Sequence, residues 1–467
     1  MGERGEVMRS GSNKIQKLLR QSSPTRIIVL SFLCVIAVGT LLLTLPFSSR
    51  SGNFTNPVNA LFTATSTTCV TGLAVYDTYS YWSDFGQAVI LVLIQCGGLG
   101  FSTFATAFAL LFRRKLGIRE LSLVRESTGG SSLDVVSLLR VVVLFTLTVE
   151  AIGAGLLMLR FVPLYGNLGI WASVFISVSA FCNAGFDVLS FIPGNASLSA
   201  FNGDPFVTLT ISGLITTGST GFVIFQDIYR KKMRPAFRRQ PRGRLSFHSA
   251  VCLYATGILL LLGTVLFFVF EYNNTLEGMP FFEKLNAAFF QSVNTRTAGF
   301  CSVDIASEKD MTKLLTIILM FIGGCPASVA GGVKVTTVVV LFAAVKSTLV
   351  GEDDTVLLRH RFDKTMVSKS LTVVTLGLLI VALDTAVITG LHGFVDVFDA
   401  LIETVSAFAT VGLTASVTPK LGVISKLILC VTMFIGRVGP VSLGLAILMR
   451  DNKKNGVILP EGRLLIG

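Results

Sequence analysis

Long apolar stretches separated by short polar segments run through most of this 467-residue chain. A helix needs about 20 apolar residues to cross a membrane, and these stretches are apolar all round rather than along one face. We expect eight spans, at about 27–45, 86–112, 136–160, 205–229, 249–270, 314–345, 371–389 and 423–449. The pattern predicts an all-α polytopic membrane protein with eight transmembrane helices, not a soluble domain.

A shorter apolar segment lies between the two spans of each pair and ends in a recurring motif. These segments are too short to cross a membrane and are typical of re-entrant helices. The motifs occupy residues 66–72, 179–185, 293–299 and 406–412, and their last glycines are spaced by 113, 114 and 113 residues. Such regularity indicates internal repeats. We therefore predict four copies of one unit (helix, pore helix, filter strand, helix) around one central pore.

Charge gives the orientation of these repeats. Only 14% of residues are charged, against about 25% in a typical soluble domain. The net charge of +12 is concentrated after second spans, as in Arg113–Lys115 and the stretch from Arg359 to Lys364. Basic loops at the ends of apolar spans face the cytoplasm in membrane proteins. This position of the basic residues, rather than their number, indicates a membrane protein and not a nucleic-acid-binding one. We place the repeats at 24–115, 116–232, 233–350 and 351–450, between cytoplasmic tails at 1–23 and 451–467.

Four filter strands suit the coordination of a dehydrated cation. Potassium filters replace the hydration shell of the ion with backbone carbonyl oxygens from four strands around one axis. Glycine permits the backbone conformations that such a strand needs, and residues 410–412 read Thr-Val-Gly, as in potassium channels. The predicted potassium-coordinating residues are Val70, Thr71, Gly72, Asn183, Ala184, Gly185, Thr297, Ala298, Gly299, Thr410, Val411 and Gly412.

Other classes fit less well. Helix packing through small residues explains any single motif but not four at equal spacing. A proton-coupled secondary cation transporter is the alternative; it predicts inverted repeats and midplane carboxylates, whereas these repeats are parallel. A membrane enzyme is disfavoured, because the sequence has no nucleophile–base pair, zinc motif or phosphate-binding loop. The eight isolated cysteines indicate neither disulfides nor a metal site.

Three segments, at 290–300, 323–334 and 436–440, resemble the Trk/Ktr/HKT superfamily of potassium transporters, and bacterial Ktr membrane subunits most closely. The resemblance covers nearly the whole chain. It implies potassium as substrate, because Gly72 is not the serine that accompanies sodium permeation in that family. It also implies no covalent cofactor, sodium as activator and a homodimer in the bacterial inner membrane. The implied partner is a cytosolic ring of RCK-type regulatory subunits that bind adenine nucleotides, with no nucleic acid.

The sixth span is interrupted by glycine and proline, and backbone freed in this way must face protein or water. A kinked packing helix explains the interruption, but the resemblance implies a gate loop below the filter. Its residues are Gly323, Gly324, Cys325, Pro326, Ala327, Ser328, Val329, Ala330, Gly331 and Gly332, with Arg437 as a pore-lining arginine bonded to it.

Other charged residues also lie within apolar segments. We expect Arg296 to brace the filter from behind through a carboxylate such as Glu403. For Glu150 and Asp384, a structural ion pair and a role in transport both stay open.

Overall fold

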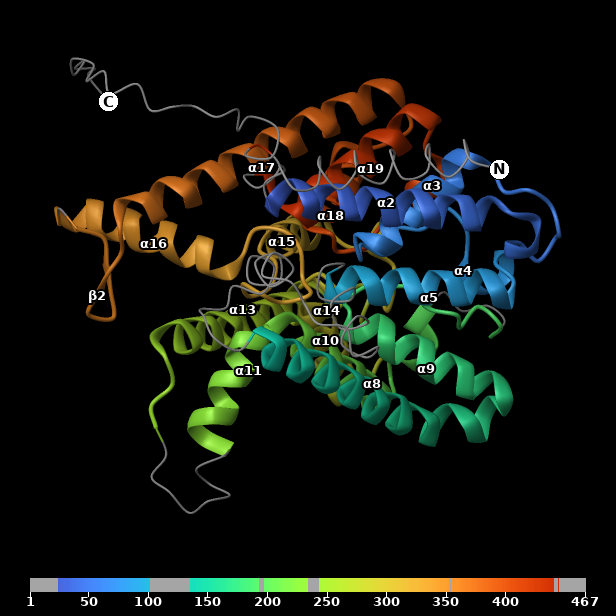
Figure 1. The fold of residues 1–467 in the computed structure, drawn as a ribbon, viewed down its shortest axis with the longest axis horizontal. Helices are drawn as coiled ribbons and strands as arrows, with labels where there is room; N and C mark the ends of the chain where they lie inside the picture. The colour runs from blue at the N-terminus through green and yellow to red at the C-terminus, as the bar shows by residue number, and fades with distance from the viewer. Residues whose placement is uncertain are drawn as a thin grey trace, which may run out of the picture.

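The computed structural model describes residues 24–100, 135–192, 197–233, 243–352, 354–440 and 444. These residues are almost entirely helical, and their one strand pair is the short hairpin of β1 (Val356–Leu357) and β2 (His360–Arg361). The predicted tails at 1–23 and 451–467, and the basic cluster Arg113–Lys115, lie outside the described residues. The all-α prediction is confirmed for the described part of the chain (Figure 1).

The predicted order of elements occurs four times. The first helices are α2 (Pro24–Thr44), α8 (Val135–Tyr165), α13 (Phe247–Glu271) and α17 (Lys364–Leu391). The pore helices are α3 (Pro57–Thr68), α9 (Asn167–Phe181), α14 (Phe281–Asn294) and α18 (Val397–Ala409). The second helices are α5 (Asp84–Leu99), α10 (Pro205–Thr220) with α11 (Phe222–Ile228), α15 (Asp310–Phe321) with α16 (Val335–Val350), and α19 (Val423–Val438). Short helices such as α4 (Thr78–Tyr81) and η4 (Ile305–Ser307) lie in the connections.

Local sequence explains where several of these helices begin. The Asn56 side chain accepts a hydrogen bond from Val58 N, and Pro57 occupies the first turn of α3. Asp396 caps α18 in the same way through Phe398 N. Such caps satisfy backbone N–H groups that have no partner inside the helix. The pore helices α3 and α18 therefore begin at polar capping residues, whereas α9 and α14 follow Gly166 and Pro280 without a side-chain cap.

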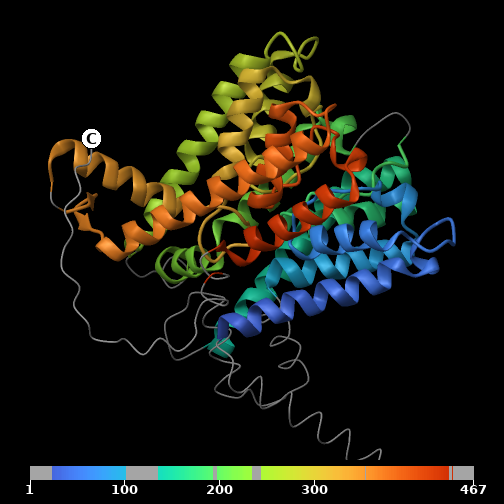
Figure 2. The same ribbon diagram turned by 90° about the horizontal axis from the view of Figure 1, so that it is seen from above.

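The long first helices are the clearest membrane spans. Among the described residues, four helices are long and apolar enough to cross a membrane, or five if α10 and α11 are counted together. The expected spans 86–112 and 423–449 extend past the described residues, so the total of eight crossings stays a prediction. In Figure 1, β2 and α4 lie at opposite ends of the molecule, and α16 and α17 project beyond the remaining helices in both views (Figures 1 and 2).

The prediction of a continuous span at 205–229 is wrong. The helix bends by 95° between α10 and α11, at Gly221, whose φ is +93°. A side chain at Gly221 would lie 2.7 Å from the carbonyl oxygen of Pro326. The break therefore makes room for the segment that interrupts the second helix of repeat three.

A belt of polar contacts joins each repeat to the next. Each contact links the fourth residue of a second helix to the following pore helix, and the last one closes the circle back to repeat one. The pairs are Gln87 Oε1 with Trp171 Nε1 at 2.7 Å, Thr208 Oγ1 with Asn286 Nδ2 at 2.8 Å, Lys313 Nζ with Asp399 Oδ1 at 2.8 Å, and Lys426 Nζ with Asn59 Oδ1 at 3.2 Å. These contacts hold four covalently linked repeats in a ring.

We expect Lys313→Met to destabilise the protein by about 1–3 kcal/mol, since it leaves the largely buried Asp399 carboxylate without its ion-pair partner. The Lys313 and Asp399 side chains are only 10% and 23% exposed. The measurement is the thermal unfolding midpoint of purified protein in detergent. The double variant Lys313→Met/Asp399→Leu removes both charges and should recover most of the loss. Equal midpoints for wild type and Lys313→Met would show that this contact does not hold repeats three and four together.

Candidate functional site

The four predicted filter strands share one unusual backbone conformation. The last glycine of each has a positive φ, between +68° and +98°. The residue two positions earlier also has a positive φ, between +51° and +66°, at Val70, Asn183, Thr297 and Thr410. This conformation costs a non-glycine residue about 1–2 kcal/mol and is rare for β-branched side chains. Strain of this kind persists only where the surrounding structure enforces it, so the strands are held firmly in one shape.

The strands form a closed ring. A Cβ atom added to the glycine of one strand would collide with a carbonyl oxygen of the next, at 2.6 Å for Gly72 and for Gly185 and closer for the other two. The pairs run once around the circle: Gly72 with Ala184, Gly185 with Ala298, Gly299 with Val411, and Gly412 with Thr71. The structure therefore brings all four predicted strands together in chain order.

Hydrogen bonds from the pore helices hold these strands. Ser66 accepts from the backbone of its own strand, through its carbonyl oxygen to Thr71 N at 2.7 Å and its hydroxyl to Gly72 N at 3.2 Å. Ser406 does the same for Val411 N and Gly412 N, at 2.8 and 2.9 Å. The negative ends of all four helix dipoles lie at the strands, which favours a cation there.

A cavity of about 140 Å³ opens on one side of the ring. Its lining includes all four glycines, together with Asp77 and Asp187. Burial raises the pKa of Asp187 above its ordinary value. The Asp77 carboxylate, which also lines this cavity, adds negative charge at the mouth and attracts cations toward it.

The predicted gate segment lies against the other side of the ring. It connects α15 to α16 without helical structure, and a Cβ atom at Gly332 would lie 3.1 Å from Ala409 Cα, just before the fourth strand. Its backbone is bonded to the break between α10 and α11: Cys325 N donates to Ser219 O at 3.0 Å, and Phe222 N donates to Ala327 O at 3.2 Å. The freed backbone groups thus find partners inside the protein.

Two cationic side chains hold the carbonyl groups of this segment. Arg437 donates to Val329 O and to Gly97 O at the end of α5. Lys334 donates to Ala330 O and, at 3.4 Å, to Gly331 O. Sequence analysis assigned no role to Lys334, although its position two residues after the predicted segment was a signal. The two positive charges raise the local electrostatic potential beside this segment.

The expected link between Arg296 and Glu403 is wrong. Arg296 donates to Gly323 O at 3.1 Å, and its other guanidinium nitrogens have no hydrogen-bond partner among the described residues. Glu403 instead accepts from Thr414, Thr418 and Val417 N of its own repeat. Arg296 therefore joins the third strand to the gate segment, whereas Glu403 stabilises the loop after the fourth strand.

The intramembrane acids Glu150 and Asp384 accept hydrogen bonds from neutral side chains. Glu150 contacts Gln95 Nε2 at 3.3 Å and Cys182 Sγ at 3.8 Å, and Asp384 contacts Thr432 Oγ1. Neither forms an ion pair with another described residue.

A Gly-x-x-Gly pattern in the second helices was also missed by sequence analysis. It occurs at 97–100, 218–221 and 436–439. At the first glycine of each, a Cβ atom would collide with a carbonyl oxygen at the end of a pore helix, those of Thr68, Phe181 and Phe408. The second glycine ends the helix with φ between +76° and +93°. The pattern therefore lets second helices pack tightly behind the ring and then end, with a further helix, α11, following directly at Gly221.

Parallel helical repeats with long apolar helices around a narrow backbone ring define a polytopic membrane transport protein. The chain matches the family of TrkH cation transport proteins over residues 6–455. It is 37% identical over 462 residues to the Ktr system potassium uptake protein B of Bacillus subtilis (strain 168), covering 97% of this chain and 99% of that protein. It is 35% identical over 459 residues to the potassium/sodium uptake protein NtpJ of Enterococcus hirae, with the same coverage.

The crystal structure of the potassium transporter TrkH from Vibrio parahaemolyticus has a similar fold, with a TM-score of 0.69 at 17% identity. The similarity covers 91% of this chain and 85% of that one. The chain belongs to the TrkH family of cation transport proteins. This confirms the resemblance drawn from the sequence, and the prediction of a transporter rather than an enzyme.

Proposed function

We propose that this chain takes up potassium across a bacterial cytoplasmic membrane through the ring of four filter strands. The closed ring carries the proposal, because all four repeats contribute backbone carbonyl groups to it, and a dehydrated potassium ion needs a ring of such oxygen ligands. The acidic residues of the cavity, Asp77 and Asp187, attract cations to one side of the ring. The names of the two relatives above, both uptake proteins for potassium, agree with this function.

We further propose that residues 323–332 are the gate. The segment lies beneath the ring, and Arg437 and Lys334 hold its carbonyl groups in place. Their positive charges oppose the passage of cations while the segment stays in this position. Opening would require these hydrogen bonds to be exchanged for bonds to water or to other groups.

We extend the proposal to the regulation and assembly of the protein. The Bacillus relative is named as part of a Ktr system, which agrees with a separate cytosolic RCK-type ring that binds adenine nucleotides. The Enterococcus relative is named for sodium as well as potassium, which agrees with stimulation by sodium. We propose a homodimer of membrane subunits in lipid, with both termini in the cytoplasm.

Uptake in a bacterial strain that lacks its own potassium-uptake systems tests this function. Expression of the chain together with its regulatory subunit should restore growth at low potassium and give rubidium uptake that potassium inhibits and sodium does not. A proton-coupled carrier would instead show uptake that stops when the proton gradient is collapsed at constant membrane voltage. Absence of potassium or rubidium uptake with protein present in the membrane would refute the proposal.

A further inference from the structure

Repeat three holds its filter strand differently from repeats one and four. Val293 occupies the position of Ser66 and Ser406, six residues before the last glycine, so no hydroxyl is available there. The Asn294 side chain takes over this role. Its Oδ1 accepts from Phe300 N at 2.8 Å, and its Nδ2 donates to Phe300 O. The Asn294 side chain thus holds the third strand through Phe300, the residue directly after Gly299.

A chain of buried polar side chains leads from Asn294 to a carboxyl group. Asn294 Nδ2 contacts Gln291 Oε1 at 3.5 Å, and Gln291 Nε2 donates to Glu308 Oε1 at 3.2 Å. Ser302, beyond the filter, donates to Gln291 Oε1 at 3.4 Å. Asn294, Gln291 and Glu308 are 0%, 1% and 5% exposed. Buried polar groups are costly unless paired, so each member of such a chain fixes its neighbours.

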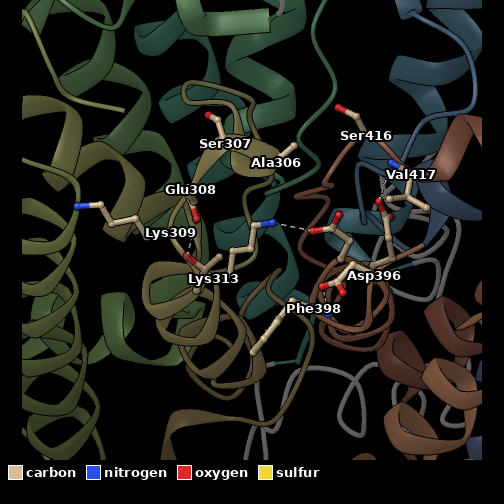
Figure 3. Close-up of polar contacts among 12 residues, drawn as sticks. Ala306, Ser307, Glu308, Lys309, Lys313, Asp396, Phe398, Ser416 and Val417 are labelled. Atoms are coloured by element: carbon tan, nitrogen blue, oxygen red, sulfur yellow. Dashed lines mark hydrogen bonds and ion pairs between the residues drawn. The ribbon is translucent and has the colours of Figure 1, made fainter. Parts of the chain in front are cut away.

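The surroundings of Glu308 favour its neutral form. Hydrogen bonds from Gln291 and from Thr316 on α15, 3.4 Å from its other oxygen, favour the ionised form, but burial and the Glu271 carboxylate at the end of α13 outweigh them. Lys313, a cation that favours the ionised form of Glu308, is bound to Asp399 across the boundary with repeat four. Figure 3 shows Lys313 and Glu308 in the same part of the structure. Burial, followed by the negative charge of Glu271, raises the pKa of Glu308 to about 8. The carboxyl is therefore protonated at neutral pH.

We propose that Glu308 is a positioning residue for ion selection: through Gln291 and Asn294, its carboxyl holds the third filter strand at the radius that potassium requires. This inference rests on the proposed function of the ring. The carboxyl accepts the hydrogen bond from the Gln291 amide, whose own oxygen is the acceptor for Asn294. Without the Glu308 carboxyl, the Gln291 side chain can rotate. The Asn294 side chain, which holds Phe300, then loses its fixed orientation.

Ionisation of Glu308 should disturb the same chain. Above about pH 8 on the filter side, a second buried negative charge forms beside Glu271 and must be hydrated. The carboxylate is a stronger acceptor for the Gln291 amide than the neutral acid, but the water that hydrates its charge enters behind the third strand and loosens it. Discrimination of potassium over sodium should therefore fall as the pH on the filter side rises from about 7 to about 9.

The test uses full-length protein in vesicles and compares potassium and sodium uptake across this pH range. Glu308→Ala should lower the potassium-to-sodium ratio at least about fivefold near pH 7, because it leaves a buried amide donor without an acceptor, and its ratio should then not change with pH. Glu308→Gln keeps a neutral acceptor, so its ratio should match that of the wild type near neutral pH and should not change with pH. Exchanging the pair, Gln291→Glu/Glu308→Gln, retains one acid and one amide and should recover most of the ratio lost in Glu308→Ala. Asp310→Asn, an exposed acid two residues away, is the matched control and should behave like the wild type.

Three results overturn the inference: a folded Glu308→Ala protein with the wild-type ratio, a Glu308→Gln protein that keeps the pH dependence, or a wild-type ratio that is constant with pH. A wild-type chain that does not discriminate potassium from sodium would instead refute the proposed function itself. The two failures are therefore distinguished within one set of measurements.

Discussion

Serine in place of Gly72 is expected to lower the discrimination of potassium over sodium by at least about tenfold, a free-energy change of about 1.4 kcal/mol. Gly72 has φ +98°, which an L-residue rarely adopts, and its Cβ would lie 2.6 Å from Ala184 O in the ring. The added atom displaces a carbonyl group of the ring or the strand that carries it, and these carbonyl groups are the proposed ligands of potassium. The measurement is rubidium uptake in competition with potassium and with sodium.

Gly52 supplies the matched control for this substitution. Its φ of +69° is also positive, but nothing lies within 4 Å of an added Cβ atom. Gly52→Ser therefore reproduces the backbone strain without entering the ring, and selectivity should stay at the wild-type value. Equal selectivity in both variants and the wild type would mean that the ring does not select the ion.

Deletion of residues 326–330 is expected to raise potassium flux roughly tenfold, as if a barrier of about 1.4 kcal/mol were removed. The deletion removes the carbonyl group of Val329, to which Arg437 donates, and that of Ala327, which bonds to Phe222 N. Affinity should change little, since no filter residue is altered. The measurement is flux in reconstituted vesicles, with and without the cytosolic regulatory subunit, on which the variant should depend less.

A milder variant covers the case in which the deletion prevents folding. Arg437→Ala removes the donor to Val329 O and one positive charge, so flux should rise in the same direction. Arg361→Ala removes an exposed arginine that pairs with Asp354 in the β1–β2 region and should leave flux unchanged. Well-folded Arg437→Ala protein with wild-type flux and regulation would contradict the assignment of residues 323–332 as the gate.

The repeat architecture could be predicted from sequence because its signals recur at equal spacing. The filter glycines lie at a nearly constant interval, and the structure places all four in one ring. The interruption in the second helix of repeat three was also visible, because proline and paired glycines break an apolar run. Local composition and periodicity are sufficient for features of this kind.

The points at which the other described second helices end were harder to predict. Gly100, Gly221 and Gly439 follow their filter glycines by 28, 36 and 27 residues (100−72, 221−185, 439−412), so their period is irregular. A single glycine in a helix is often tolerated. The bend at Gly221 arises because the gate segment of another repeat packs against it, a contact between distant parts of the chain.

The partners of charged side chains were the least predictable feature. Arg296 bonds to Gly323 O rather than to Glu403, and Lys334 holds carbonyl groups of the gate segment. The belt that includes Lys313 and Asp399 joins residues 86 positions apart. A single sequence gives the type of such residues but not which of several possible partners lies within reach.

Rubidium diffraction tests the central claim most directly, because rubidium replaces potassium and scatters anomalously. Crystals of the protein grown in rubidium should show an anomalous peak on the axis of the ring, surrounded by the carbonyl oxygens of Thr71, Ala184, Ala298 and Val411. Crystals grown in sodium alone should show no ion with that coordination. Transport-active protein whose bound rubidium lies elsewhere, with none at this ring, would contradict the account.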